Sequence, residues 1–164
     1  MEEVSKWDMD FLLPSTQLHD VGKIAISDLI LNKPGKLTAE EFEIMKTHVT
    51  VGVDAIEKII NITHEHAFLK HSLYIAGTHH EKWDGSGYPM KLKGKNIPLE
   101  GRIMAIADVY DALVSERPYK EPITHEEAGK IIIENSGAHF DPALVEIFRE
   151  IAGQFAEVAK EIGA

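Results

Sequence analysis

Apolar residues recur along this chain at the spacing of an α-helix, and no convincing stretch alternates apolar with polar residues. Capping boxes at Thr38–Glu41 and Thr124–Glu127 each predict a helix start. Asp141-Pro142 is a third start signal, an N-cap followed by proline. Apolar residues follow it at helical period: Leu144, Ile147, Phe148, Ile151, Phe155, Val158 and Ile162. The sequence predicts an all-α helical bundle of about six to seven helices.

The same spacing predicts where the individual helices lie. We expect Pro14 to bend the first helix or to start a turn, and the helix that starts at residue 38 to break or kink near His48 or Gly52. The expected helices cover residues 1–21, 27–31, from 38 past 56, about 64–79, 101–114, 124–136 and from 141 to 162.

Length and composition limit the possible functions. A chain of 164 residues with 44% hydrophobic and 27% charged residues fits one globular domain over residues 1–164. It has no apolar run near the ~18 residues of a membrane span. Without cysteine, any metal must be held by nitrogen and oxygen, and a cytoplasmic location is expected. The net charge of −10 argues against binding long DNA or RNA but leaves a small phosphate-containing substrate possible.

Residues 79–89 place two adjacent histidines before an acid and a glycine-rich turn. Successive side chains of a helix point about 100° apart, so His79 and His80 reach one centre only at a helix end. Gly85, Gly87 and Pro89 supply that end. For the histidine pair taken alone, a helix terminus with two solvated imidazoles is the alternative interpretation.

Other residues near helix ends favour a metal centre. The candidate ligands are four imidazoles and two carboxylates: His19, Asp20, His48, His79, His80 and Asp108. Such a set suits iron or manganese, and an aspartate can bridge two ions that together support phosphate ester hydrolysis. Asp111 is an alternative to Asp108 in this set. Lys23 is either a cation at a helix end or a phosphate contact.

These motifs, in this order, resemble those of the HD-GYP family, a bacterial branch of the HD-domain phosphohydrolases. The resemblance runs from about Leu18 to Phe148. The segments that carry it are residues 19–23 (HDVGK), 31–38, 79–89, 102–113, 117–120 and 137–142.

The resemblance implies hydrolysis of cyclic di-GMP to pGpG or onward to GMP, by attack of a metal-activated hydroxide on phosphorus. It implies two or three divalent metal ions, iron or manganese, with Asp20 as the bridging ligand. His19 would be a further ligand, Asp108 would bind the first ion, and the second ion would be bound by His48, His79 and His80. Lys23 would contact the scissile phosphate or assist the leaving oxygen.

Further contacts of the substrate also follow from the resemblance. Arg117 and Lys120 would meet phosphate and guanine. Tyr88 lies in the loop that gives the family its name, and this loop would contact substrate, shape the site or meet a regulatory or GGDEF-type signalling domain.

The sequence departs from the family in one respect. The family usually brings a further histidine, and often a glutamate, from helices before the HD pair, and residues 1–18 contain no histidine. We expect an N-terminally truncated domain in which the first metal site is weakly filled. The alternatives are a catalytically impaired module that binds cyclic di-GMP or a partner domain, and a phosphohydrolase of another nucleotide. The apolar stripe of residues 144–162 is either core or the seam of a homodimer.

Overall fold

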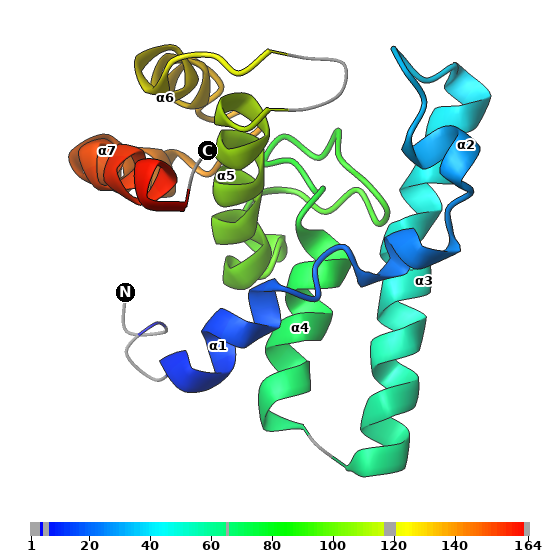
Figure 1. Cartoon of the computed structure of the whole chain (residues 1–164). Coiled ribbons are helices and arrows are strands. Elements are labelled where there is room, and N and C mark those ends of the chain that lie inside the picture. The colour runs from blue at the N-terminus through cyan, green and yellow to red at the C-terminus, as the bar shows by residue number, and fades with distance from the viewer. Residues whose placement is uncertain (1–3, 5–6, 65, 117–120, 163–164) are drawn as a thin grey trace. The chain divides into compact units, whose positions relative to one another are not determined.

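The computed structural model describes residues 4, 7–64, 66–116 and 121–162, and within them the chain forms seven α-helices and no strand (Figure 1). The all-α prediction is therefore confirmed. The contacts divide the chain into two compact units, residues 1–79 and 80–164. A single domain over residues 1–164 stays a prediction.

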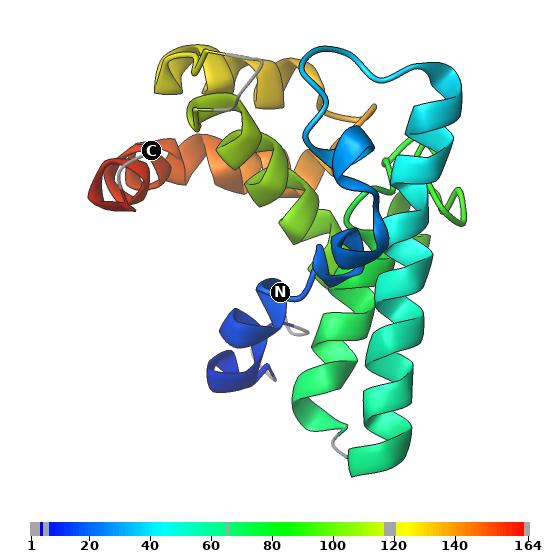
Figure 2. The same cartoon turned by 45° about the vertical axis from the view of Figure 1, so that its right-hand side comes forward.

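The first unit is built around a pair of long helices. Figures 1 and 2 show α3 and α4 side by side, with α1 lying along α4. The hydroxyl of Ser15 in α1 donates to the carbonyl oxygen of Phe68 in α4, 2.9 Å away. Ile56, Leu69 and Ala76 form the buried centre of this unit. Its elements are α1 (Met9–Thr16), the 3-10 helix η2 (Val21–Ala25), α2 (Asp28–Leu31), α3 (Ala39–Thr63) and α4 (Ala67–Thr78).

The second unit packs α6 and α7 against α5. Its core includes the buried side chains of Tyr110, Phe140 and Phe148. The guanidinium of Arg102 in α5 pairs with the carboxylate of Asp141 at the start of α7, with Nη1 and Oδ2 2.7 Å apart. The elements of this unit are the 3-10 helix η3 (Gly94–Asn96), α5 (Leu99–Val114), α6 (His125–Glu134) and α7 (Pro142–Ile162).

The helix starts predicted from capping residues are confirmed. Both hydrogen bonds of the capping box are present at Thr38–Glu41 and at Thr124–Glu127. Oδ1 of Asp141 accepts from the amide of Ala143 at 2.9 Å, as an N-cap side chain does.

The first predicted helix is wrong in its extent. We expected helix over residues 1–21, but α1 ends at Thr16 and the chain then turns through His19 and Asp20 before η2. Pro14 lies inside α1 and has no amide hydrogen to donate to the preceding turn. The hydroxyl of Thr16 also bonds the carbonyl oxygen of Leu13 at 2.7 Å. Both features weaken the helix near its observed end.

The predicted break in the second long helix is also wrong, because α3 runs without interruption over 25 residues. Gly52 lies instead where η2 packs against α3. A Cβ on Gly52 would lie 3.3 Å from the amide nitrogen of Gly22. The missing side chains of these two glycines allow η2 to approach the backbone of α3 closely.

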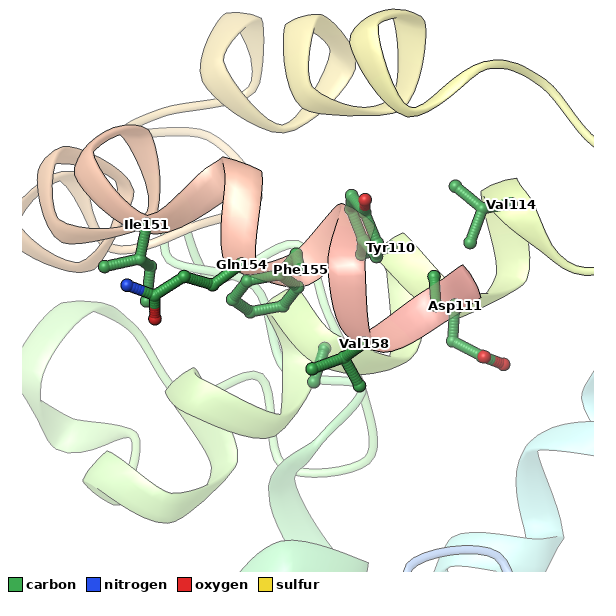
Figure 3. A pocket seen from close by; sticks show the side chains of 9 residues that line it. Tyr110, Asp111, Val114, Ile151, Gln154, Phe155 and Val158 are labelled. Carbon is green, nitrogen blue, oxygen red and sulfur yellow. The ribbon is translucent and has the colours of Figure 1, made fainter. Parts of the chain in front are cut away.

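An open, mainly apolar pocket of about 330 Å³ lies between α5 and α7 (Figure 3). Tyr110 and Phe155 line it, and Val158 at its edge is 55% exposed. Phe148, from the same apolar stripe of α7, is buried in the core. The stripe is therefore partly core and partly exposed.

None of the helices in the described part of the chain combines the length and apolar character that crossing a membrane requires.

Candidate metal centre

His19 and Asp20 lie in the turn between α1 and η2, which frees their side chains from the direction that a regular helix would impose. Nδ1 of His19 is 2.7 Å from the carbonyl oxygen of Thr16. A carbonyl oxygen only accepts hydrogen bonds, so Nδ1 carries the proton and Nε2 is presented on the opposite side of the ring.

His48 and His79 use the same arrangement from two other helices. His48 lies within α3, and its Nδ1 is 2.7 Å from the carbonyl oxygen of Met45. His79 caps the C-terminus of α4, and its Nδ1 is 3.0 Å from the carbonyl oxygen of Ile75. Both side chains are buried. Each helix thus fixes the tautomer and the ring orientation of one histidine, as commonly seen for metal-ligating histidines.

The carboxylate of Asp20 is the point on which these imidazoles converge. Its Oδ1 lies 3.3 Å from Nε2 of His48 and 3.8 Å from Nε2 of His79. Its Oδ2 lies 3.2 Å from Nε2 of His19. Asp20, His48 and His79 offer potential ligand atoms that all lie within 4.8 Å of one another. The two oxygens of Asp20 therefore face different histidines.

Electrostatics keep this carboxylate ionised. Burial alone would raise the pKa of Asp20, but the neighbouring imidazoles of His19 and His79 and the ammonium of Lys23 lower it well below its ordinary value. Burial lowers the pKa of His48 and favours its neutral form. A neutral His48 protonated on Nδ1 turns the lone pair of Nε2 toward a carboxylate oxygen. The lone pair of Nε2 and the carboxylate oxygen repel each other unless a cation lies between them.

The donor set fits a divalent cation. Among the residues that the structure describes, the buried Oδ1 of Asp20 accepts no hydrogen bond. A buried carboxylate oxygen in this situation is costly, and a cation relieves the cost. Imidazole nitrogen and carboxylate oxygen are the ligand types that iron and manganese accept.

Lys23 lies beside the cluster, on the first turn after it. Its Nζ is 2.5 Å from Oδ2 of Asp20, and its side chain is 36% exposed. The ammonium group therefore touches the carboxylate while part of the side chain remains open to solvent. Both predicted roles, cation at a helix end and phosphate contact, remain compatible with this position.

The other predicted site residues belong to the second unit or lie outside the description. His80 follows His79 directly in the chain, and its ring lies against the ring of Tyr88 in a tilted arrangement. Asp108 lies half-buried on α5, and Asp111 is exposed on the same helix. Arg117 and Lys120 lie outside the described residues. Within the first unit the structure thus groups His19, Asp20, His48, His79 and Lys23, and the role of every predicted site residue stays a prediction.

Two residues that shape the local structure were not predicted from the sequence. The first is Gly22, whose lack of a side chain lets η2 approach α3; the only signal was a glycine between Asp20 and Lys23. The second is Glu81, whose buried carboxylate accepts hydrogen bonds from the amides of Met90 and Leu92. Burial raises the pKa of Glu81, although these amides oppose the shift.

Comparison with known proteins gives one family and several named relatives. Residues 3–144 match the family described as HD domain. A cyclic di-GMP phosphodiesterase of Vibrio cholerae serotype O1 is 51% identical over 151 residues, which are 92% of this chain and 31% of the relative. A cyclic di-GMP phosphodiesterase of Thermotoga maritima is 46% identical over 158 residues, 96% of this chain and 41% of the relative. The 3'3'-cGAMP-specific phosphodiesterase 2 of Vibrio cholerae is 46% identical over 151 residues, which are 92% of this chain and 28% of the relative.

A solved structure agrees with these relatives. The crystal structure of a cyclic GMP-AMP specific phosphodiesterase of Vibrio cholerae aligns with a TM-score of 0.55 and 26% identity, covering 89% of this chain and 37% of that chain. The chain spans less than half the length of these relatives. Because the family match covers residues 3–144 of 164, this chain belongs to the HD domain family, as its resemblance to the HD-GYP branch predicted.

Proposed function

We propose that this chain is the hydrolytic domain of a metal-dependent cyclic dinucleotide phosphodiesterase, with cyclic di-GMP as its substrate. The observation that carries the proposal is the convergence of imidazole Nε2 atoms from His19, His48 and His79 on the two oxygens of Asp20. The names of relatives at 46 to 51% identity support the substrate class.

The proposed centre holds two or three divalent ions, iron or manganese. Asp20 would bridge two of them, because Oδ1 faces His48 and His79 while Oδ2 faces His19. From the family motif we add His80 to the ion of His48 and His79, and Asp108 to the ion of His19. When bound, such ions supply Lewis acidity and a water of lowered pKa.

Residues of the chain would then orient the scissile phosphate and supply the proton that the leaving oxygen takes up. The oxygen of the attacking water would bond to phosphorus as a P–O bond of the substrate breaks; the water would give up one proton and the leaving oxygen would take up one. Lys23 is the proposed contact of this phosphate or the donor to the leaving oxygen, since its ammonium lies beside Asp20 and is partly open to solvent. Arg117 and Lys120 are proposed to contact the substrate on the basis of the family motif.

A related substrate is favoured by a specific observation. Similar proteins named for cyclic GMP-AMP include one at 46% and one at 26% identity. Hydrolysis of 3'3'-cGAMP is therefore the second candidate function. The alternative from another class is a module that binds the nucleotide without cleaving it.

We also propose two partners and a location. The loop after residue 88 exposes Met90 and would meet a regulatory or GGDEF-type signalling domain. The exposed part of the α7 stripe at Val158 would take part in a homodimer. A cytoplasmic location follows from the proposed second-messenger substrate.

The test is turnover followed by nucleotide chromatography. The chain is purified anaerobically and incubated with cyclic di-GMP or 3'3'-cGAMP, with and without added manganese or ferrous iron. The proposal expects linear pGpG or GMP from cyclic di-GMP only when metal is bound. Bound nucleotide without product, at full metal occupancy, would support the binding module. Faster cleavage of 3'3'-cGAMP would favour the second candidate.

A further inference from the structure

In the second unit, residues 80–92 form a loop that folds back against its own beginning. The amide of Tyr88 donates to the carbonyl oxygen of His80 at 3.2 Å. A Cβ on Gly87 would lie 2.4 Å from the amide nitrogen of Lys82 and 2.6 Å from the carbonyl oxygen of His80. Only glycine permits this close approach, so residue 87 is pressed directly onto the backbone that follows His79.

Glu81 closes the other end of the loop. Its side chain is 2% exposed, and no other carboxylate in the described residues is as deeply buried. Oε1 accepts from the amide of Met90 at 2.7 Å, and Oε2 accepts from the amide of Leu92 at 3.0 Å. Charge-assisted bonds of this kind are among the strong hydrogen bonds of proteins, so both carboxylate oxygens hold the loop in place.

The folded loop brings the ring of Tyr88 against the imidazole of His80. The two ring centroids are 4.8 Å apart, and the ring planes make an angle of 33°. His19, His48 and His79 are each oriented through Nδ1 and a carbonyl oxygen three or four residues earlier. His80 lies just beyond α4, where the chain leaves the helix, and the Tyr88 ring lies against its imidazole in a tilted arrangement.

We propose that Glu81 and Tyr88 are positioning residues for His80, and that Tyr88 acts through its ring rather than its hydroxyl. Glu81 fixes the loop, the loop fixes Tyr88, and the Tyr88 ring fixes the imidazole of His80 in one orientation. This inference rests on the proposed function, in which His80 is a metal ligand. It differs from the sequence-based expectation that Tyr88 contacts the substrate.

The experiment measures manganese binding to the full 164-residue chain by titration calorimetry. Amide hydrogen exchange reports the protection of the loop amides, and thermal melting shows at which temperatures each variant remains folded. The variants are Glu81→Gln, Tyr88→Leu and Tyr88→Phe. Gln has the shape of Glu, but its amide nitrogen would face a backbone N–H where a carboxylate oxygen now accepts. Tyr88→Leu removes the ring, and Tyr88→Phe removes only the hydroxyl. Lys95→Ala, an exposed change elsewhere in the same connection, is the matched control.

We expect Glu81→Gln to lose exchange protection at Met90 and Leu92. Because loss of an outer-shell partner weakens metal binding by roughly 10- to 100-fold, Glu81→Gln and Tyr88→Leu should bind manganese at least about tenfold more weakly at temperatures where both remain folded. Tyr88→Phe and Lys95→Ala should bind it like the wild type. Recovery of affinity by the Phe ring is a result that a general loss of stability would not produce.

The outcomes separate this inference from the proposed function. Wild-type manganese affinity in Tyr88→Leu, with cleavage lost in Tyr88→Phe, would overturn the positioning role and assign the hydroxyl to substrate. Weakened binding in Glu81→Gln and Tyr88→Leu, with no cleavage of cyclic dinucleotide by any form, would support the positioning role and overturn the proposed reaction. A wild-type chain that binds no manganese would overturn both.

Discussion

The backbone of Gly22 lies directly against the carbonyl group of His48. A Cβ on Gly22 would be 1.9 Å from this carbonyl oxygen and 2.6 Å from the amide nitrogen of Gly52. Gly22 follows Asp20 by two residues, and His48 belongs to the same candidate metal centre. The contact therefore joins the turn that carries the carboxylate to the helix that carries a buried imidazole.

Replacing Gly22 by alanine should separate η2 from α3. We expect Gly22→Ala to lower the free energy of unfolding by about 1–3 kcal/mol, since backbone atoms cannot move aside as a flexible side chain would. Urea denaturation measures the change. The control is Gly153→Ala on α7, where a Cβ meets no atom within 4 Å. That control should be stabilised by up to about 1 kcal/mol, as for glycine to alanine in a helix. Equal stability of Gly22→Ala and wild type would contradict the role of this contact.

Lys23→Met should have opposite effects on metal binding and on turnover. The ammonium of Lys23 pairs with Oδ2 of Asp20, where it competes with a metal for the carboxylate. We expect manganese affinity to rise when this charge is removed. Turnover should fall by at least about 100-fold, the usual lower range for loss of a proton donor. Lys23→Arg, which keeps the charge, should leave manganese affinity near that of the wild type. A parallel fall of affinity and turnover in Lys23→Met would show that Lys23 supports the metal site instead.

His139 should make stability depend on pH. Burial and, after it, the charge of Lys82 lower the pKa of His139 from 6.5 to about 4, with Asp84 opposing the shift. Its contribution to stability is complete above pH 6.5, where both folded and unfolded forms are neutral, and is lost as the pH falls toward 4. The full shift corresponds to about 3.5 kcal/mol, at about 1.4 kcal/mol per pKa unit, and the partial solvent exposure of His139 makes the expected loss smaller than this.

Denaturation of wild type and His139→Asn between pH 4 and 7 isolates this contribution, because the carboxylates that also titrate there are common to both proteins. The stability of His139→Asn should fall less steeply with decreasing pH. Equal pH dependence of the two proteins would mean that His139 titrates alike in the folded and unfolded chains.

The features that could be predicted from the sequence are those encoded locally. Thr38 and Thr124 mark helix starts because the hydrogen-bonding partner of each lies three residues away. The end of α1 was missed because Pro14 weakens a helix to a degree that depends on what packs against it. The prediction of a break near Gly52 failed for a related reason. Glycine in a helix marks either a break or a close contact, and only the position of Gly22 shows which applies.

In the candidate site, the residues could be predicted from the sequence but the contacts between them could not. His19, Asp20, His48 and His79 were named from residue types and a family motif, without any indication of which carboxylate oxygen faces which histidine. The bonds of Glu81 to the amides of Met90 and Leu92 could not be predicted, because every residue except proline offers the same amide group. Such contacts depend on the path of the loop, and the sequence alone does not define that path.

The most direct test of the metal centre is the metal content of Asp20→Asn. Wild type, Asp20→Asn and the exposed control Asp54→Asn on α3 are purified anaerobically and analysed by plasma mass spectrometry, with circular dichroism to confirm folding. We expect the wild type and Asp54→Asn to retain iron or manganese at one ion per chain or more, and Asp20→Asn to lose it. An equal metal content in Asp20→Asn and wild type, or a wild type that remains metal-free after incubation with both ions, would contradict the assignment of Asp20 and its histidines as a metal centre.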